Sequence, residues 1–208
     1  MFDLFVRCLN AKYTHTEHSG SYAIQTDKDT LYILFECSNG KEDWINNFDF
    51  PKTPYKRMNE KWFAHRGFLK VWRAMRDEIE CEVSNILQSS PEIENIICVG
   101  YSHGGALSLL ATEDMTYLYS ELYNVYGFGF GAPRVIWGVI PKSLKKRLSN
   151  FFVIRNIPDI VTHVPPKIFG FRDAGNLIEI GEYFKYNPIK AHYSGSYKTE
   201  LKNYTEEQ

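Results

Sequence analysis

Apolar positions along the chain follow two different spacings, and each spacing predicts a different element. Residues 21–26 and 31–37 have strand-like patterns on either side of a polar turn, which predicts a hairpin with a mostly apolar second strand. Residues 67–88 carry apolar side chains at spacings of three and four, opposite charged ones, and predict a long helix that covers a sheet. A short apolar run at residues 96–99 predicts a buried strand, and the small and apolar residues 105–112 predict a helix after it.

The second half of the chain repeats this succession of strands and helices. Residues 123–131 alternate aromatic residues with glycines, so one face of this predicted strand is bare backbone that could admit the preceding helix at short distance. There follow a helix from Pro141, a strand at residues 151–156, a late strand within residues 177–186 as part of a hairpin, and a short terminal helix. We therefore predict a single α/β domain over residues 1–208, with a mostly parallel central sheet and helices on both faces.

Three stretches lack such a clear pattern. The N-terminal stretch has mixed signals and is expected to be mostly loop, and residues 51–63 are expected to form an irregular connection. Residues 41–50 are long enough for two helical turns, with Trp44, Ile45 and Phe48 on one face. Such a short amphipathic helix either packs on the surface or covers a site as a lid, and the pattern alone favours the packed surface helix.

Ser102 lies in the motif Gly-Tyr-Ser-His-Gly, residues 100–104, between the predicted buried strand and the helix that follows it. A G-x-S-x-G sequence in this context is the pattern of a nucleophile elbow, a sharp turn that holds its serine strained and exposed. Glycines flank the serine because side chains there would block the close passage of the backbones. The alternative is a glycine-rich turn with an incidental serine, but the strand before and the helix after favour Ser102 as a nucleophile.

A serine hydroxyl needs a base to take its proton and a third group to orient that base. The histidines that follow Ser102 are His103, His163 and His192. His103 leads the helix and cannot also turn its ring toward the serine, while His163 is more simply a polar loop residue close to Asp159. His192, in a separate loop, is therefore the predicted base, and activity is expected to be lost as it becomes protonated.

The acid is less determined by its order in the chain. Asp159 is preferred because it follows a predicted parallel strand, where α/β sheets place their sites, and because Val-Pro-Pro after it makes a short, rigid loop. The other carboxylates between the serine and the predicted base are Glu113, Asp114, Glu121, Asp173, Glu179 and Glu182. An oxyanion hole would combine the backbone N–H of His103 with a donor from the loop after an early strand, for which Ser38 is the choice. Removal of one such donor typically costs about 3 kcal/mol of transition-state stabilisation.

Composition narrows the classes of function. The chain has 208 residues and a formal net charge of −1, so it lacks the positive field that nucleic-acid binding requires. No apolar run reaches the roughly 20 residues of a membrane span, and Asp3 and Arg7 interrupt what would be the core of a signal peptide. We therefore expect a cytoplasmic protein without a transmembrane segment. The four cysteines have neither metal-ligand spacing nor a disulfide framework, and no cofactor or metal is expected.

Six segments of the chain match, in order, the motifs of one family. FECSNGKEDWINNF resembles F-R-G-S/T followed by an N-W or D-W helix, AHRGFLKVW resembles V-H-x-G-F, and VGYSHGGALSLLAT resembles V-x-G-H-S-L-G-G-A-L-A. YGFGFGAPRV resembles T-F-G-x-P-R-V-G, RNIPDIVTHVPP resembles R-x-x-N-x-x-D-x-V-P-x-L-P-P, and HYSGSY resembles H-x-x-x-Y. These segments, which together span residues 35–197, resemble the class 3 lipases, the family of the filamentous-fungal triacylglycerol lipases and related esterases.

The resemblance implies a single-domain α/β-hydrolase fold with Ser102 as nucleophile, Asp159 as acid and His192 as base, in agreement with the choices made from the residues themselves. It places Ser38 on the oxyanion serine or threonine of the family. It also matches His65 to a histidine that the family keeps at a helix start, where a structural hydrogen bond is expected.

The same resemblance changes the interpretation of residues 43–50, which fall on the lid helix of the family. Trp44 matches the lid tryptophan, so Trp44, Ile45 and Phe48 are predicted to contact substrate rather than only to pack on the surface. Glu36 and Cys37 stand where the family usually has Arg and Gly, beside the predicted oxyanion donor.

The expected function is a serine carboxylic-ester hydrolase that cleaves acylglycerols or similar lipid esters through an acyl-enzyme, with transient contact to a lipid interface. Alternatives on the same fold are an esterase for soluble esters, an acyltransferase, or a non-catalytic lipid-binding module. The secreted fungal relatives carry a signal peptide and disulfides that this sequence does not show, which favours an intracellular or virus-encoded member.

Overall fold

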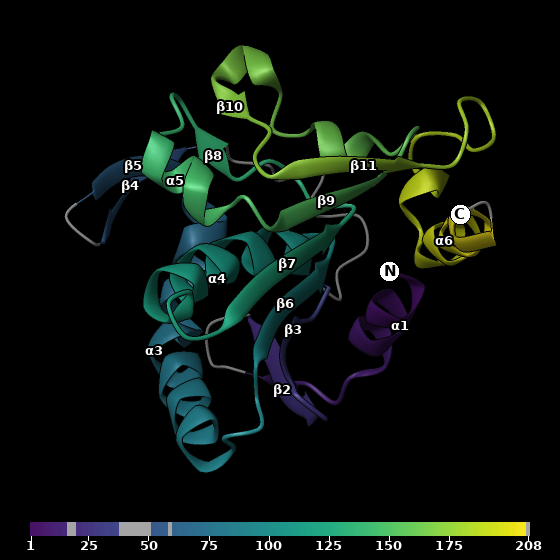
Figure 1. The fold of residues 1–208 in the computed structure, drawn as a ribbon. Coiled ribbons are helices and arrows are strands. Elements are labelled where there is room, and N and C mark those ends of the chain that lie inside the picture. Colours follow the sequence, from purple (N-terminus) through teal and green to yellow (C-terminus); the bar gives the residue numbers. More distant parts are fainter. Residues whose placement is uncertain (16–19, 38–50, 58–59, 207–208) are drawn as a thin grey trace.

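The computed structural model describes residues 1–15, 20–37, 51–57 and 60–206, and these residues contain a seven-stranded central sheet (Figure 1). The strand order is β1-β2-β3-β6-β7-β9-β11. The strands are β1 Thr14–His15, β2 Ser21–Asp27, β3 Thr30–Phe35, β6 Asn95–Tyr101, β7 Asn124–Phe130, β9 Phe151–Asn156 and β11 Asn176–Ile180. Neighbours from β3 to β11 pair in parallel, while β1 and β2 form an antiparallel edge. The predicted mostly parallel sheet is therefore confirmed.

Helices cover both faces of this sheet (Figure 1). One face packs against α3 Arg66–Ser89 and α4 His103–Tyr119, with α5 Lys142–Arg147 beside α4, and the other packs against α1 Phe2–Asn10 and α6 Ser194–Glu206. The alternation of side chains along β6 explains the two layers. Ile96 and Cys98 lie in the core on the α3 and α4 face, whereas Val99 and Tyr101 lie in the core on the α1 and α6 face.

The predicted long helix and its start agree closely with the structure. Helix α3 runs over Arg66–Ser89, against the predicted residues 67–88, and buries one stripe of apolar residues. His65 caps its N-terminus, where the His65 Nδ1 atom accepts a 3.5 Å hydrogen bond from the Phe68 N–H. The expected structural role of His65 is thus present.

The N-terminal stretch forms a helix where a loop was expected. Helix α1 buries Phe5 and Cys8, and the Phe5 ring contacts Tyr101, Phe130 and Tyr197 at centroid distances of 5.4, 4.9 and 5.8 Å. So short a helix is marginal by itself and is stabilised by docking its apolar face on the sheet. The prediction of loop was wrong because this docking surface comes from distant parts of the chain.

Residues 51–63, where an irregular connection was expected, instead supply two strands of a second, four-stranded sheet. Its order is β10-β8-β5-β4, with β4 Lys52–Arg57, β5 Glu60–His65, β8 Ile136–Trp137 and β10 Phe171–Arg172, all pairs being antiparallel. Tyr55 and Trp62 face each other across β4 and β5 with ring centroids 4.5 Å apart. Such aromatic cross-strand pairs stabilise a hairpin without a long periodic pattern, and that is why the periodicity missed it.

The last strand also differs from the prediction. Strand β11 ends at Ile180 and pairs in parallel with β9, from Asn176 beside Phe152 to Ile180 beside Asn156, so it is not part of a hairpin. The chain then runs through an exposed loop and the one-turn helix η3 Lys190–His192 into α6. Two other one-turn helices, η1 Ile160–His163 and η2 Lys167–Phe169, follow β9. Within the described ranges, no helix is long and apolar enough to cross a bilayer.

Candidate active site

Ser102 occupies the sharp turn between β6 and α4, with backbone angles φ 56° and ψ −120°. Positive φ is uncommon for a residue with a side chain, and here it occurs at the carboxyl end of β6. The expectation of an exposed serine is wrong, because Ser102 is only 1% exposed. A Cβ on Gly100 would lie 1.9 Å from the Gly104 carbonyl oxygen, and one on Gly104 would lie 2.3 Å from the Phe35 carbonyl oxygen. The glycines of the motif are therefore required by the close passage of three backbone segments.

The helix after the serine approaches the sheet over the bare face of β7. A Cβ on Gly127 would lie 2.0 Å from the Thr112 Oγ1 atom, and one on Gly129 would lie 3.2 Å from the Gly105 carbonyl oxygen. The short helix-to-sheet distance predicted from the alternating glycines is confirmed. This close packing holds the N-terminal end of α4, and with it Ser102, in a fixed place.

Hydrogen bonds connect the three residues predicted to form the triad. The His192 Nε2 atom lies 2.8 Å from the Ser102 Oγ atom, and the His192 Nδ1 atom lies 2.8 Å from the Asp159 Oδ2 atom. Asp159 is fully buried and the His192 side chain is 14% exposed. Ser102 comes from the β6–α4 turn, Asp159 from the end of β9 and His192 from η3, so three separate segments meet here. The exposed His163 belongs to η1 and is not part of this chain of bonds.

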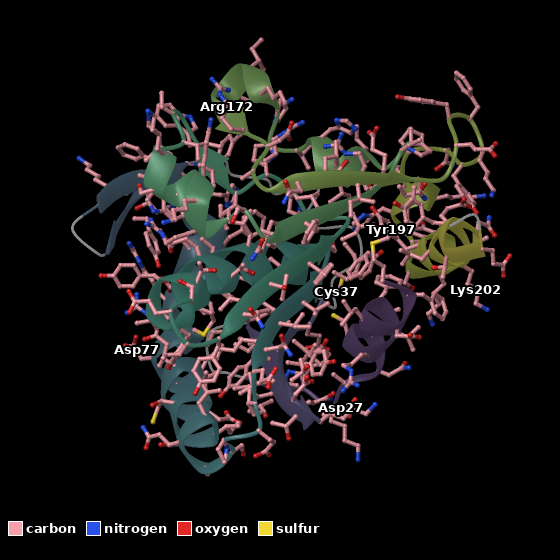
Figure 2. All side chains as sticks on the ribbon, in the orientation of Figure 1. Asp27, Cys37, Asp77, Arg172, Tyr197 and Lys202 are labelled. Carbon is pink, nitrogen blue, oxygen red and sulfur yellow. The ribbon has the colours of Figure 1, made fainter. Side chains whose placement is uncertain are left out.

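The Asp159 carboxylate accepts further hydrogen bonds that sequence reasoning did not assign. The Val161 N–H donates to Oδ1 at 2.9 Å, and the Tyr197 hydroxyl donates to Oδ2 at 2.7 Å. Tyr197 is completely buried between α6 and the sheet, and its hydroxyl also accepts from the Asn156 N–H at 3.1 Å (Figure 2). Burial and the negative charge of Asp159 raise the pKa of Tyr197 well above its ordinary value, so the hydroxyl remains a donor.

Replacing Tyr197 by phenylalanine is expected to destabilise the protein and to lower kcat with little change in KM. The buried Asn156 N–H would lose its acceptor, and Asp159 would lose a donor, which should cost about 1–3 kcal/mol in the free energy of unfolding. Urea unfolding and steady-state kinetics would measure both effects. Tyr186→Phe is the matched control, because the Tyr186 hydroxyl donates to Glu200, away from the triad. Equal effects of the two substitutions would contradict this role.

Two other residues hold the His192 segment in place. The Tyr101 ring stacks on the His192 ring at 5.3 Å with an interplanar angle of 26°, and the Tyr101 hydroxyl donates to the His192 carbonyl oxygen. The Asn156 side-chain amide donates to the Ala191 carbonyl oxygen at 2.9 Å. Neither role was predicted. The available signals were the place of Tyr101 directly before the serine and the Asn of the R-x-x-N-x-x-D motif.

His103 is largely buried at the first position of α4, with its ring 5.4 Å from the Phe68 ring. Burial lowers the pKa of His103 to about 4, so the side chain is neutral at pH 7. The first N–H groups of a helix have no partner within the helix and carry its positive end, as the predicted oxyanion donor requires. The other predicted donor, Ser38, lies outside the described residues. So do the predicted lid residues Trp44, Ile45 and Phe48.

Acid is expected to destabilise the protein partly through His103. Between pH 6.5 and about 4, the unfolded chain binds a proton at this position that the folded protein excludes. The contribution of His103 to the free energy of unfolding is therefore complete above pH 6.5 and is lost as the pH falls toward 4. The loss approaches about 3 kcal/mol at the acid end of this window. His103→Leu keeps the backbone N–H and should remove this part of the pH dependence. Urea unfolding of both proteins from pH 7 to pH 4 would show the difference, and identical slopes would contradict it.

The α/β hydrolases are defined by a parallel sheet and by a serine on a tight strand-to-helix turn, with a histidine and an aspartate from later loops. This chain has all of these features, so the expected fold is confirmed. Residues 32–169 match the family model "Lipase (class 3)", and the chain belongs to this family. Among the described residues, no group of three or more His, Cys, Asp or Glu side chains is arranged to hold a metal ion.

The relatives of the chain are fungal lipases. It is 29% identical over 156 residues to a lipase of Rhizomucor miehei, covering 70% of this chain and 40% of that protein. It is 26% identical over 141 residues to the secreted mono- and diacylglycerol lipase A of Penicillium cyclopium, covering 66% of this chain and 44% of that protein. The chain thus spans less than half the length of these relatives.

A solved structure supports the same fold. It is a triacylglycerol lipase whose catalytic centre is formed by a serine protease triad, and it superposes with a TM-score of 0.71 at 25% identity, over 82% of this chain and 66% of that one.

The expectation of a cytoplasmic location is wrong. The relative from Penicillium cyclopium is named as a secreted lipase, which points to the outside of the cell.

Proposed function

We propose that this protein is a serine carboxylic-ester hydrolase that cleaves acylglycerols or similar lipid esters. The observation that carries the proposal is the pair of hydrogen bonds that join Ser102 to His192 and His192 to Asp159, in a member of the class 3 lipase family. Ser102 follows β6 and Asp159 follows β9, both at the carboxyl ends of these strands. Nucleophile, base and orienting acid lie within hydrogen-bond reach of one another, which is the arrangement that acyl transfer from an ester requires.

In the first half of the proposed reaction, the Ser102 Oγ atom attacks the ester carbonyl carbon while the His192 Nε2 atom takes the serine proton. The negative charge moves to the former carbonyl oxygen, which accepts hydrogen bonds from the His103 N–H and from the predicted donor Ser38. Asp159 holds His192 in the tautomer with its Nδ1 protonated and stabilises the imidazolium. The tetrahedral intermediate collapses as His192 returns the proton to the leaving alcohol, and the acyl group stays on Ser102.

In the second half, water replaces the alcohol. His192 takes a proton from the water as its oxygen attacks the acyl carbon, and the same donors hold the second oxyanion. When this intermediate collapses, the proton returns to the Ser102 Oγ atom and the carboxylic acid leaves. The sum is one ester and one water converted to one acid and one alcohol, without an added cofactor.

Exposed apolar side chains next to Asp159 and His192 in the chain, and in the loop that leads to His192, support a lipid-contacting rim. Ile160 follows Asp159 and is 41% exposed, and Tyr193 follows His192 and is 56% exposed. The loop between β11 and η3, which projects at the upper right of Figure 1, adds Ile189 at 58% and Phe184 at 98% exposure. The Ile160 N–H donates to the Pro188 carbonyl oxygen, so the two segments are joined. Clustered apolar side chains of this kind mark surfaces that contact lipid or protein, and aromatic rings are favoured at lipid interfaces.

Phe184→Ser is expected to lower hydrolysis of emulsified triacylglycerol while leaving the turnover of a dissolved short-chain ester nearly unchanged. The reason is that the Phe184 side chain is 98% exposed, in the loop between β11 and η3, and takes no part in the hydrogen bonds among Ser102, His192 and Asp159. Removing its burial in lipid should weaken adsorption by about 1.5–3 kcal/mol. The matched control is Leu122→Ser, since Leu122 is 82% exposed but follows α4 at the opposite end of the sheet. Equal losses on both substrates, or equal effects of both variants, would contradict a lipid-contacting rim.

A hydrolysis profile tests the proposed function as a whole. Esters of increasing acyl length would be assayed below and above their solubility limits. We expect long-chain acylglycerols to be cleaved and the rate to increase when the substrate forms an interface. Smooth saturation with short esters alone would indicate an esterase for soluble substrates. No turnover, together with no labelling of Ser102 by a fluorophosphonate probe in the folded protein, would indicate a non-catalytic lipid-binding module.

A further inference from the structure

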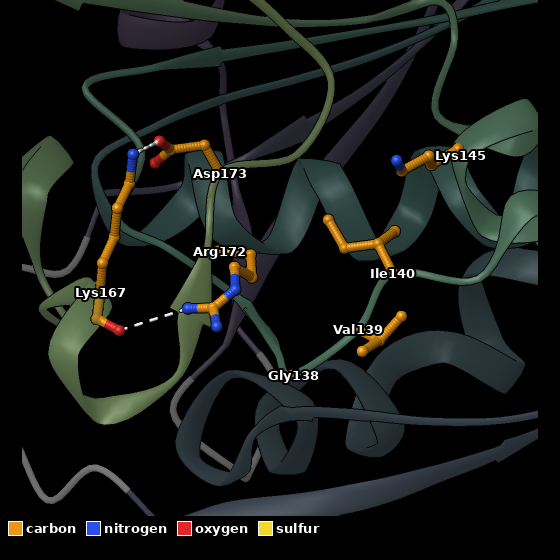
Figure 3. A pocket seen from close by; sticks show the side chains of 7 residues that line it. All are labelled: Gly138, Val139, Ile140, Lys145, Lys167, Arg172 and Asp173. Carbon is orange, nitrogen blue, oxygen red and sulfur yellow. Dashed lines mark hydrogen bonds and ion pairs between the residues drawn. The ribbon is translucent and has the colours of Figure 1, made fainter.

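A cationic cavity lies between η2, β10 and the segment that links β8 to α5. This cavity is wide open to solvent and has a volume of about 530 Å³ (Figure 3). Its lining residues are Gly138, Val139, Ile140, Lys145, Lys167, Arg172 and Asp173. A smaller recess of about 40 Å³ shares Arg172 and Asp173 with this cavity and is lined also by Arg134 and Arg155. None of these residues contributes to the hydrogen bonds of the triad.

Positive charge exceeds negative charge here, although the whole chain carries a formal net charge of only −1. Asp173 binds Arg134 Nε and Lys167 Nζ, each at 2.6 Å. Burial raises the pKa of Asp173, but the hydrogen bonds from Lys167 and Arg134 outweigh it and lower the pKa below the usual value. Asp173 is therefore ionised and already engaged by two cations.

The remaining cations are poorly neutralised. The Arg172 guanidinium donates to the backbone oxygen of Lys167 at 3.2 Å (Figure 3) and to that of Phe171 at 3.0 Å. Among the described residues it makes no ion pair with a carboxylate. Lys145 reaches the cavity from α5, on the side opposite Lys167 in Figure 3, and has no carboxylate partner among the described residues. Both side chains are free to bind an added anion.

Arg155 gives the second observation, because it is buried and incompletely paired. It is 8% exposed, and its Nε atom has no hydrogen-bond partner in the described part of the chain. Its terminal nitrogens lie 3.6 Å from Glu179 and 4.0 Å from Asp173, beyond the length of a good charge-assisted hydrogen bond. Arg155 lines the recess, and its terminal nitrogens, which lack a short bond to either carboxylate, can donate to a further acceptor there.

We propose that the recess and the cavity together bind a tetrahedral oxyanion of the phosphate or phosphomonoester class. Guanidinium groups present paired donors that match phosphate oxygens, and Arg155 and Arg172 would supply them from the inner and outer parts of the site. Lys145 would add a third positive charge from the α5 side of the cavity. The ligand is either free phosphate or the phosphomonoester head group of a lipid, which presents the same chemistry. This binding function is separate from ester hydrolysis at Ser102.

Calorimetric titration of the full chain with inorganic phosphate tests this proposal. We expect saturable binding with one phosphate per chain, weakened about tenfold or more by Arg172→Gln and by Arg155→Met. The matched control is Arg73→Gln, since Arg73 is exposed on α3 and also donates to a backbone oxygen, but lies outside the cavity. No saturable binding by the unaltered protein, or the same affinity in Arg172→Gln and Arg73→Gln, would overturn it. Arg172 is at the surface, so this test stands even if the Arg155 variant fails to fold.

Vesicles distinguish the two sources of the anion. Cosedimentation with phosphatidylcholine vesicles that contain phosphatidic acid, compared with phosphatidylcholine alone, shows whether a lipid head group binds. Binding that Arg172→Gln removes assigns the site to the head group, and binding of inorganic phosphate without vesicle binding assigns it to the soluble ion. The same titration in Ser102→Ala protein should give unchanged phosphate affinity, so a failure of the proposed hydrolase function would not be mistaken for a failure of this site.

Discussion

Replacing Ser102 by alanine is expected to lower ester hydrolysis by about a millionfold while the fold remains intact. The variant keeps the Cβ and loses only the Oγ atom that lies 2.8 Å from His192 Nε2. Without this oxygen no acyl-enzyme can form, and His192 and Asp159 have no nucleophile to activate. Stability should change little, because the backbone at φ 56° is held by the surrounding packing and an alanine side chain fits the same space.

This variant would be assayed with a chromogenic ester and with an acylglycerol, beside urea unfolding to confirm the fold. Ser120→Ala is the matched control, since Ser120 is exposed at the far end of the same helix. The control should retain full activity. Hydrolysis by Ser102→Ala at more than a few per cent of the unaltered rate would show that the proposed nucleophile is wrong.

Asp159→Asn is expected to lower kcat by about ten-thousandfold. The aspartate accepts from His192 Nδ1 and so holds the ring with Nε2 free to take the serine proton. An amide in its place can donate to Nδ1, which favours the opposite tautomer with a proton on Nε2. The imidazolium that forms during the reaction would also lose its neighbouring negative charge.

The fold of this variant should survive, because asparagine can still accept from the Val161 N–H and can share a hydrogen bond with the Tyr197 hydroxyl. Asp77→Asn is the matched control: it makes the same change of charge on the exposed face of α3, where Asp77 pairs only with Arg76 among the described residues. A loss of less than tenfold in the folded Asp159 variant would exclude the proposed orienting role.

The elbow could be predicted because its physical constraint is local. Gly100 and Gly104 are required by contacts within a few residues of Ser102 and with one neighbouring strand. Their spacing in the sequence is therefore enough to predict the turn. Asp159 and His192 were found by elimination, since few residues satisfied the order Ser, acid, His and the expected strand end. The structure places all three within hydrogen-bond distance.

The residues that hold the triad were missed because they act through tertiary contacts. Tyr197 reaches Asp159 from a helix 38 residues further along the chain, and Tyr101 reaches His192 across 91 residues. Helix α1 is short and is stabilised by the packing of Phe5 against Tyr101, Phe130 and Tyr197. Apolar periodicity reports the face that an element buries, but not the element against which it packs.

The prediction of strand pairing was wrong for a related reason, since pairing also depends on tertiary contacts. The pattern of β11 is compatible with either a hairpin or a parallel pair, and the choice depends on where β9 lies. Strands β4 and β5 are held by the Tyr55 and Trp62 pair and by a hydrogen bond from the Tyr55 hydroxyl to the buried Asp114. Asp114 was one of the alternative acids in sequence order, and its partners in the structure are Tyr55 and Trp72 rather than the triad histidine.

Covalent labelling with a fluorophosphonate probe tests the central claim most directly, because it reports an activated serine without assuming a substrate. Intact mass and peptide mapping should find one probe per chain, attached to Ser102. Labelling should be absent in Ser102→Ala and strongly slowed in Asp159→Asn. A folded protein that takes up no probe, or that carries it on another residue, would contradict the assignment of Ser102, His192 and Asp159 as a working catalytic triad.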